Sequence, residues 1–191
     1  MPVQFPDLYE SIPLMYVRRH DVGKWAWVRA RADSTDLDWV DVSENVTNWT
    51  GYWHIDAKVT VTGHYNFVPY FKFRGESVHA STVPQLGLPE DAGGTKQDII
   101  CHLRVSTGAS QKFFDAGLHS QHLNDTEQYV PFNVEKSTNF DKETITLANG
   151  TQIEIDVNIE LKVSAKLGLC YLDFLTVGYG IQLKYLLLAK Y

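Results

Sequence analysis

The chain has 191 residues and a net charge of −6, from 23 acidic and 17 basic residues, and 44% of its residues are hydrophobic. This length suits one domain with a substantial core, and the composition excludes a disordered chain. The mild acidity argues against direct nucleic-acid binding, which needs a basic patch to displace counterions. No run of 18 apolar residues occurs, so no membrane-spanning segment is expected. The start, M-P-V-Q-F-P-D-L-Y, lacks the basic and apolar regions of a signal peptide, which predicts a soluble protein.

The N-terminal residues predict an arm followed by a single domain. Residues 1–20 contain three prolines and no clear hydrophobic period, which is typical of an extended segment. After them, short runs alternate between apolar and polar residues, the period of two that a β-strand requires. The sequence therefore predicts an extended arm at 1–20 and one β-sandwich domain at 21–191.

Four strands are expected between residues 24 and 74, at 24–32, 39–42, 53–61 and 70–74. A polar turn at 33–38 and a loop at 43–51 would separate the first three. In the first strand, Trp25 and Trp27 would share one face. In the third, Trp53 begins a regular alternation that Gly63 and Asn66 then break.

The middle of the chain combines loops with further short strands. Two prolines and three glycines over 82–98 predict a long irregular loop, and such loops are often functional. Pro131 marks its strand as an edge strand, because proline has no amide hydrogen for the sheet. The expected strands are at 99–105, 111–116, 129–134 and 144–147, with a polar loop at 118–128.

The most regular strand is expected over residues 151–164. Ile153 and every second residue up to Val163 are apolar, and the residues between them are polar. One face should therefore contact the core and the other face water. In the last stretch, 171–191, two glycines predict a bend between two strands, the second with one apolar face. That face would consist of Ile181, Leu183, Tyr185 and Leu187.

The Asn149-Gly150 pair predicts a hairpin into the 151–164 strand. A two-residue turn would pair Ile145 with Glu154 and place apolar residues on the polar face. A three-residue loop with Gly150 in the left-handed region would instead pair Ile145 with Ile153. The three-residue loop is therefore expected.

Eight or more strands without a helical stripe predict an all-β fold, an antiparallel two-sheet sandwich of the jelly-roll type. Cys101 and Cys170 lie in apolar runs and are expected to be buried thiols, although a disulfide between them stays open. The Asn-X-Thr sequons are expected to be incidental in a chain without a secretory signal. They are Asn45, Asn48, Asn124 and Asn149.

The strongest candidate for catalysis is the polar face of the 151–164 strand. Glu154, Asp156, Asn158 and Glu160 share this face, and paired carboxylates can serve as nucleophile and acid in glycoside hydrolysis. The run resembles the E-I-D-x-E signature of laminarinase-like jelly-roll glycosidases, which would imply cleavage of β-glucans that depends on Glu154. Asn158 occupies the position of the acid/base glutamate, so a solvent-facing strand without catalytic residues is the favoured interpretation.

The histidines do not form a metal motif. His119 and His122 lie three residues apart in a loop-like segment, and His54 and His64 flank a strand. None of them has the His-x-His spacing of metal cupins, so no metal or cofactor is expected. Phosphate-binding loops and nucleophile elbows are also missing from the sequence.

Aromatic residues are the other candidate for binding. Trp39, Trp49, Tyr52 and Trp53 lie close to polar loops, where exposed rings could stack on sugars. Core packing is the favoured interpretation for them. Lys72 and Arg74 alternate with two phenylalanines and are expected on a solvated strand face.

The short arm, the strands and the long loops resemble viral single jelly-roll structural proteins, and the resemblance spans residues 24–191. The resemblance implies a non-enzymatic capsid shell, spike or tail protein in the virion, which forms trimers or larger homo-oligomers and contacts other structural proteins. Because the arm offers only Arg18 and Arg19, such a protein would not package nucleic acid itself. Two alternatives stay open: a carbohydrate-binding lectin or module with a glycan ligand, and a jelly-roll glycoside hydrolase.

Overall fold

The computed structural model describes residues 23–46, 52–89, 92–123, 128–138, 140 and 144–190. The predicted arm at 1–20 lies outside these residues. Twelve strands and one short helix occur in the described part, and every strand pair is antiparallel. They are β1 (Trp25–Ala26), β2 (Arg29–Ser34), β3 (Val40–Asn45), β4 (Trp53–Lys58), β5 (Gly63–Ser81), α1 (Val83–Leu86), β6 (Gly94–Thr107), β7 (Ser110–Leu123), β8 (Gln128–Ser137), β9 (Ile145–Leu147), β10 (Gln152–Lys166), β11 (Gly168–Asp173) and β12 (Gly180–Lys190).

The strands form two sheets that pack face to face. Sheet A has the order β1-β12-β5-β11-β2, with β8 and β9 on the other side of β5. Sheet B has the order β3-β10-β6-β7, with β4 beside β3 along β10. β1 and β2 share one strand position, as do β3 and β4, β8 and β9, and β11 and β12. When the eight resulting positions are numbered in chain order, sheet A has the order 1-8-3-6 and sheet B the order 2-7-4-5. This order is that of a jelly roll, so the predicted fold class is confirmed.

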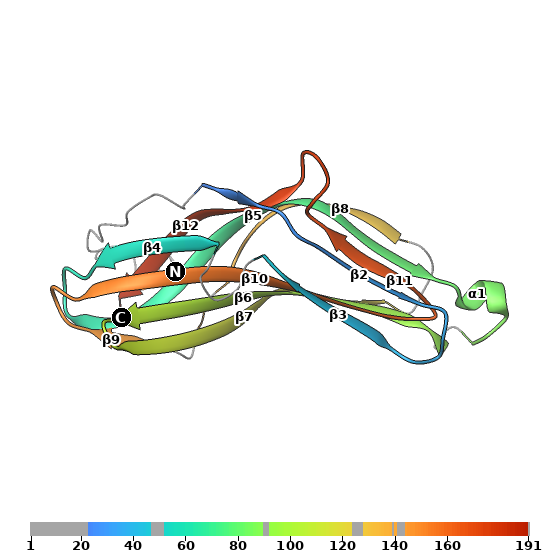
Figure 1. The fold of residues 1–191 in the computed structure, drawn as a ribbon, viewed down its shortest axis with the longest axis horizontal. Coiled ribbons are helices and arrows are strands. Elements are labelled where there is room, and N and C mark those ends of the chain that lie inside the picture. The colour runs from blue at the N-terminus through green and yellow to red at the C-terminus, as the bar shows by residue number, and fades with distance from the viewer. Residues whose placement is uncertain are drawn as a thin grey trace, which may run out of the picture.

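The long strand β5 joins the two ends of the molecule. Figure 1 shows an elongated sandwich with α1 at one end and β4 and β9 at the other. On one side, β5 pairs first with β12 and then, beyond Gly75, with β11. A Cβ atom on Gly75 would lie 2.2 Å from the carbonyl oxygen of Asp173, so only glycine permits this close approach. The break predicted at Gly63 is present, since β4 ends at Lys58 and Gly63 is the first residue of β5. Asn66 lies inside β5 and pairs with Ala189, so the break predicted there is wrong, because cross-strand pairing outweighs its low β-propensity.

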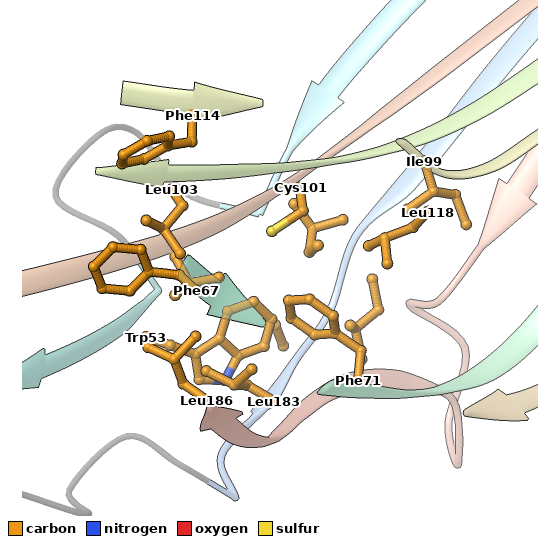
Figure 2. Packing of buried hydrophobic residues seen from close by; sticks show 14 of the residues in the cluster. Trp53, Phe67, Phe71, Ile99, Cys101, Leu103, Phe114, Leu118, Leu183 and Leu186 are labelled. Carbon is orange, nitrogen blue, oxygen red and sulfur yellow. The ribbon is translucent and has the colours of Figure 1, made fainter. Parts of the chain in front are cut away.

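The apolar faces of both sheets meet in one core. Figure 2 shows Phe67, Phe71 and Leu183 of sheet A packed towards Leu103 and Cys101 of sheet B. The alternation predicted for β6 and β10 is confirmed, because every second residue from Ile99 to Val105 and from Ile153 to Val163 is apolar and buried. Both cysteines are buried free thiols, and burial raises the pKa of each.

Several predicted boundaries differ from the structure. The run 24–32 forms two strands, and its buried residues are the alanines and Val28, whereas Trp27 points outward. β6 already begins at Gly94, and β7 continues to Leu123, so the loops predicted at 82–98 and 118–128 are shorter. β8 pairs only with β5 among the described residues, which confirms the edge strand that Pro131 predicted.

A β-bulge in β12 changes which of its residues face the core. The register shifts between Leu183 and Tyr185. Leu183, Leu186 and Leu188 are buried, whereas Tyr185 is exposed. The single face predicted from Ile181 to Leu187 is therefore wrong beyond Leu183, since a bulge reverses the inward and outward positions that follow it.

The hairpin predicted before β10 is also wrong. Ile145 pairs with Tyr65 in sheet A, whereas Ile153 pairs with Ala57 in sheet B. Gly150 has the expected positive φ of 87°, but the turn around it carries the chain from one sheet to the other. Both apolar segments line the same core from opposite sides, so matched apolar faces fit a crossover as well as a hairpin.

Candidate functional site

The carboxylate-rich face of β10 lies on the outer side of sheet B, between β6 and the pair β3 and β4. The side chain of Asp156 is only 3% exposed, and Asn158 is also buried. A water-facing position was predicted for both, and this is wrong. Polar side chains from the neighbouring strands cover them.

Asp156 is held by the two residues directly opposite it on the flanking strands, Arg104 of β6 and His54 of β4. The Nε atom of Arg104 donates to Oδ2 at 2.8 Å, its Nη2 donates to the same oxygen, and His54 Nδ1 donates to Oδ1 at 2.7 Å. The hydrogen bond to Asp156 raises the pKa of His54, and neighbouring Asp56 adds to the effect, so the imidazolium form is favoured.

Glu160 belongs to a second group of bonded side chains on this face. It accepts hydrogen bonds from Ser43 and from His102 Nε2, the latter at 2.8 Å. His102 reaches on to Asp115 of β7, 2.5 Å from its Nδ1. Burial raises the pKa of Glu160, but these bonds outweigh that effect and lower it.

This geometry does not match the carboxylate pair of a glycosidase. The acid of such a pair needs a raised pKa so that it carries a proton at neutral pH. Glu160 has a lowered pKa, Asp156 is bound to Arg104, and Asn158 donates to Asn45 at 3.3 Å. These side chains fix the sheet in register, and Glu154 is the freely exposed carboxylate of the set.

The histidine pairs singled out in the sequence do not converge. His119 contacts Phe132 of sheet A, whereas His122 packs at 6.1 Å against Trp39. His54 binds Asp156, while His64 lies 2.9 Å from the Thr146 hydroxyl in the other sheet. Among the described residues, no three His, Cys, Asp or Glu side chains are grouped so that they could hold a metal ion.

The aromatic residues picked from the sequence are mainly structural. Trp53 is fully buried, and its Nε1 donates to the Lys24 carbonyl at 3.1 Å. Tyr52 donates to the Trp25 carbonyl at 2.5 Å. Trp39 lies at the surface under the Lys96 ammonium, 4.1 Å from the ring centre. Trp49 lies outside the described residues.

The outer side of sheet A carries an aromatic surface that the sequence did not reveal. Tyr129 is 61% exposed and Tyr185 49% exposed, and Tyr185 stacks on Tyr70 with ring centres 4.7 Å apart and planes inclined by 5°. The guanidinium of Arg74 lies 5.3 Å from the ring centre of Trp25. We call this surface the aromatic face, and define it as Trp25, Trp27, Tyr70, Arg74, Tyr129, Tyr171, Tyr179 and Tyr185.

Ion pairs and hydrogen bonds hold the aromatic face in place. The hydroxyls of Tyr171 and Tyr179 both donate to Glu76, at 2.9 and 3.1 Å. Glu135 accepts from Tyr70 at 2.8 Å and from Lys184 at 3.0 Å. The alternation in β5 predicts that Tyr70 and Arg74 share a face. The pairing of Tyr185 with Tyr70 could not be predicted from the sequence, because it depends on the bulge in β12.

Comparison with known proteins adds little to this description. No family model and no curated protein matches the chain. A solved structure described as Eiger TNF from S. frugiperda is similar over 87% of this chain and 93% of that one, with 12% identity and a TM-score of 0.26. Values this low carry no conclusion about function. In the described part of the chain, no helix has the length and apolar character needed to cross a membrane.

Proposed function

We propose that this chain is a non-enzymatic structural subunit of a virus particle, a capsid shell, spike or tail component. In this proposal, copies of the chain associate through the aromatic face of sheet A. The observation that supports it is the composition of that face, because Tyr, Trp and Arg are the residues enriched at the centres of protein interfaces.

The strand edges favour contacts through this face over edge-to-edge pairing. β8 at the edge of sheet A contains Pro131, and β7 at the edge of sheet B has a register shift opposite Ile99 and Ile100. Proline and bulges interrupt the row of free hydrogen-bonding groups that a second strand would need. The other edge of sheet A is divided between two short strands, β1 with two residues and β2 with six.

Rigid rings also favour association energetically. A tyrosine has few rotatable bonds, so it loses little conformational freedom when a partner covers it. In the aromatic face, hydrogen bonds to Glu76 and Glu135 already fix three tyrosine hydroxyls. The face is therefore preorganised, which reduces the free-energy cost of binding.

The oligomeric state tests this proposal directly. Multi-angle light scattering and electron microscopy of the full chain should show trimers or larger assemblies. A double variant, Trp27→Ala with Tyr185→Ala, should shift them to monomers. Phe113→Ala is the matched control, because Phe113 is an aromatic residue of similar exposure, 52%, on the opposite face. A monomeric wild-type chain at high concentration, or equal effects of both variants, would contradict assembly through this face.

A glycan ligand is a second candidate, favoured by the Tyr70–Tyr185 stack. An exposed ring flanked by Lys184 and Glu135 offers a flat apolar surface with polar groups at its rim, which suits a sugar ring. Binding on a glycan array that Tyr185→Ala abolishes and Phe113→Ala leaves intact would support it. Trp53 is unsuitable for this test because its side chain is inside the core.

A further inference from the structure

The edge strands β7 and β8 face each other along one side of the sandwich. Lys136 Nζ of β8 donates to the Leu118 carbonyl of β7 at 3.3 Å, and the Thr138 hydroxyl donates to the Gly117 carbonyl at 3.4 Å. The ring of His119 meets the ring of Phe132 edge-on, with centres 5.1 Å apart. We call this contact the β7–β8 seam. It closes the sandwich on the side where both sheets end.

β8 packs only weakly against the core. Phe132 is its one buried apolar side chain, and nearly all its other residues are exposed. The ring of Phe132 packs against Phe73 and Phe174, at 6.1 and 5.6 Å between ring centres. Beyond its pairing with β5 and the bonds of Glu135 to Tyr70 and Lys184, the strand therefore depends on Phe132 and on the seam.

His119 and Lys136 make the seam sensitive to protonation. Lys136 Nζ lies 3.4 Å from His119 Nδ1. An ammonium group can only donate, so Nδ1 must be the accepting nitrogen and the neutral ring carries its hydrogen on Nε2. Adding a proton to Nδ1 removes the acceptor and places two positive charges against each other. The contact between Lys136 and His119, which is attractive in the closed seam, then becomes repulsive and favours opening.

The other ionisable groups around His119 do not remove this conflict. His79 of β5 lies deeper in the core, fully buried, with Nδ1 2.6 Å from the Thr95 hydroxyl. Asp98 of β6 is the acidic neighbour and favours a charged His119. Burial nevertheless lowers the pKa of His119, and Lys136 and His79 lower it further. Burial lowers the pKa of His79 and of Lys136 as well.

Two histidine ring nitrogens in and near the seam are buried. The Nε2 atoms of His79 and His119 are buried and have no hydrogen-bond partner among the residues that the structure describes. His119 also lines a surface depression of about 530 Å³ that includes Asp98 and Gly117, which gives protons from solvent a path to the ring. Protonation is therefore possible at the seam but unfavourable while the seam is closed.

We propose that the β7–β8 seam is an acid-sensitive latch: protonation of His119 beside Lys136 opens it and releases β8 with Phe132 from the core. The direction follows from linkage. A histidine whose pKa is lowered in the closed state stabilises that state above the ordinary value of 6.5, and this stability is lost as the pH falls. Opening would expose the apolar interior to solvent or to a partner.

Hydrogen exchange of the full chain, read by mass spectrometry, tests the latch. After correction for the intrinsic pH effect, peptides from β8 should exchange faster near pH 5 than near pH 7.5, because a protonated His119 favours the open seam. Peptides from β10 should not change. His119→Gln keeps an acceptor for Lys136 but cannot titrate, so its β8 peptides should lose the pH response. His64→Gln is the control, since His64 is exposed and far from the seam in sequence and pairing.

A flat wild-type response, or an unchanged response in His119→Gln, would overturn the proposal. If His119→Gln does not fold, NMR titration of the wild type decides instead. The pKa of His119 should lie below 6.5 and should rise in Lys136→Met, which removes the neighbouring charge. A pKa at or above 6.5, or one that Lys136→Met leaves unchanged, would equally overturn it.

Discussion

The outer faces of the two sheets both carry charged residues but use them differently. Along the strands of each sheet, outward side chains alternate with side chains that point into the core. On sheet B, the charges bind each other so closely that Asp156 is 3% exposed. On sheet A, charges instead hold aromatic rings at the surface, and Tyr185 stays half exposed. The difference teaches that alternation tells which way a side chain points but not whether water reaches it, because the neighbours across the strands decide that.

Removing the central carboxylate of sheet B should have the largest effect. Asp156→Asn removes the anion that binds both Arg104 and His54 and leaves the largely covered charge of Arg104 without its partner, which should cost about 3 kcal/mol. Urea denaturation should show this loss in the free energy of unfolding. Glu154→Gln on the same face should change it by less than about 0.5 kcal/mol, since Glu154 is exposed. A similar loss in both variants would mean that the network on sheet B is not what stabilises this face.

Sheet A also contains a covered carboxylate that is bound to an arginine, Asp173. Burial raises the pKa of Asp173, but hydrogen bonds from Arg29, Thr176 and two backbone amides outweigh it and lower the pKa to about 2. A lowered carboxyl pKa stabilises the fold above the ordinary value of 3.8 and ceases to do so as the pH falls to about 2. Asp173→Asn should therefore lose about 2 kcal/mol at neutral pH.

The pH dependence of unfolding checks the role of Asp173. The difference in stability between the wild type and Asp173→Asn should shrink steadily between pH 3.8 and about 2, the ordinary and lowered values. Asp33→Asn is a matched control, because Asp33 is exposed in its pair with Arg31. A difference that persists unchanged at low pH would show that the charge of Asp173 is not what stabilises the turn between β11 and β12.

The aromatic face should contribute least to stability. Tyr185→Ala removes a half-exposed ring, and a stacked aromatic pair contributes about 1 kcal/mol beyond its area. Denaturation should show a smaller loss than in Asp156→Asn, while association should be lost in light scattering. A loss as large as that of Asp156→Asn would place the Tyr70–Tyr185 stack in the structural framework and contradict a role in binding.

The sequence predicted the fold class because strict alternation survives in the long central strands. From Ile153 to Val163, every second residue is apolar and buried as expected, and the same holds from Ile99 to Val105. A period of two is a local consequence of the pleat, so it needs no knowledge of the neighbours. Pro131 likewise indicated an edge strand through its own missing amide hydrogen.

The failures all depend on pairing between distant residues. The segment around Ile145 joined β5 rather than β10, and the bulge after Leu183 turned Tyr185 outward. The acidic face of β10 looked open to water because Arg104 and His54 are 52 and 102 residues away in the chain. No local pattern indicates such partners.

The sequence by itself thus determined an all-β sandwich, its main core strands and one of its edges, since these follow from the geometry of a single strand. The tertiary structure alone decided which polar side chains bind each other, which rings stay exposed and where β7 meets β8. Each of these depends on cross-strand register, and register is set by the packing of the whole sandwich rather than by any one segment.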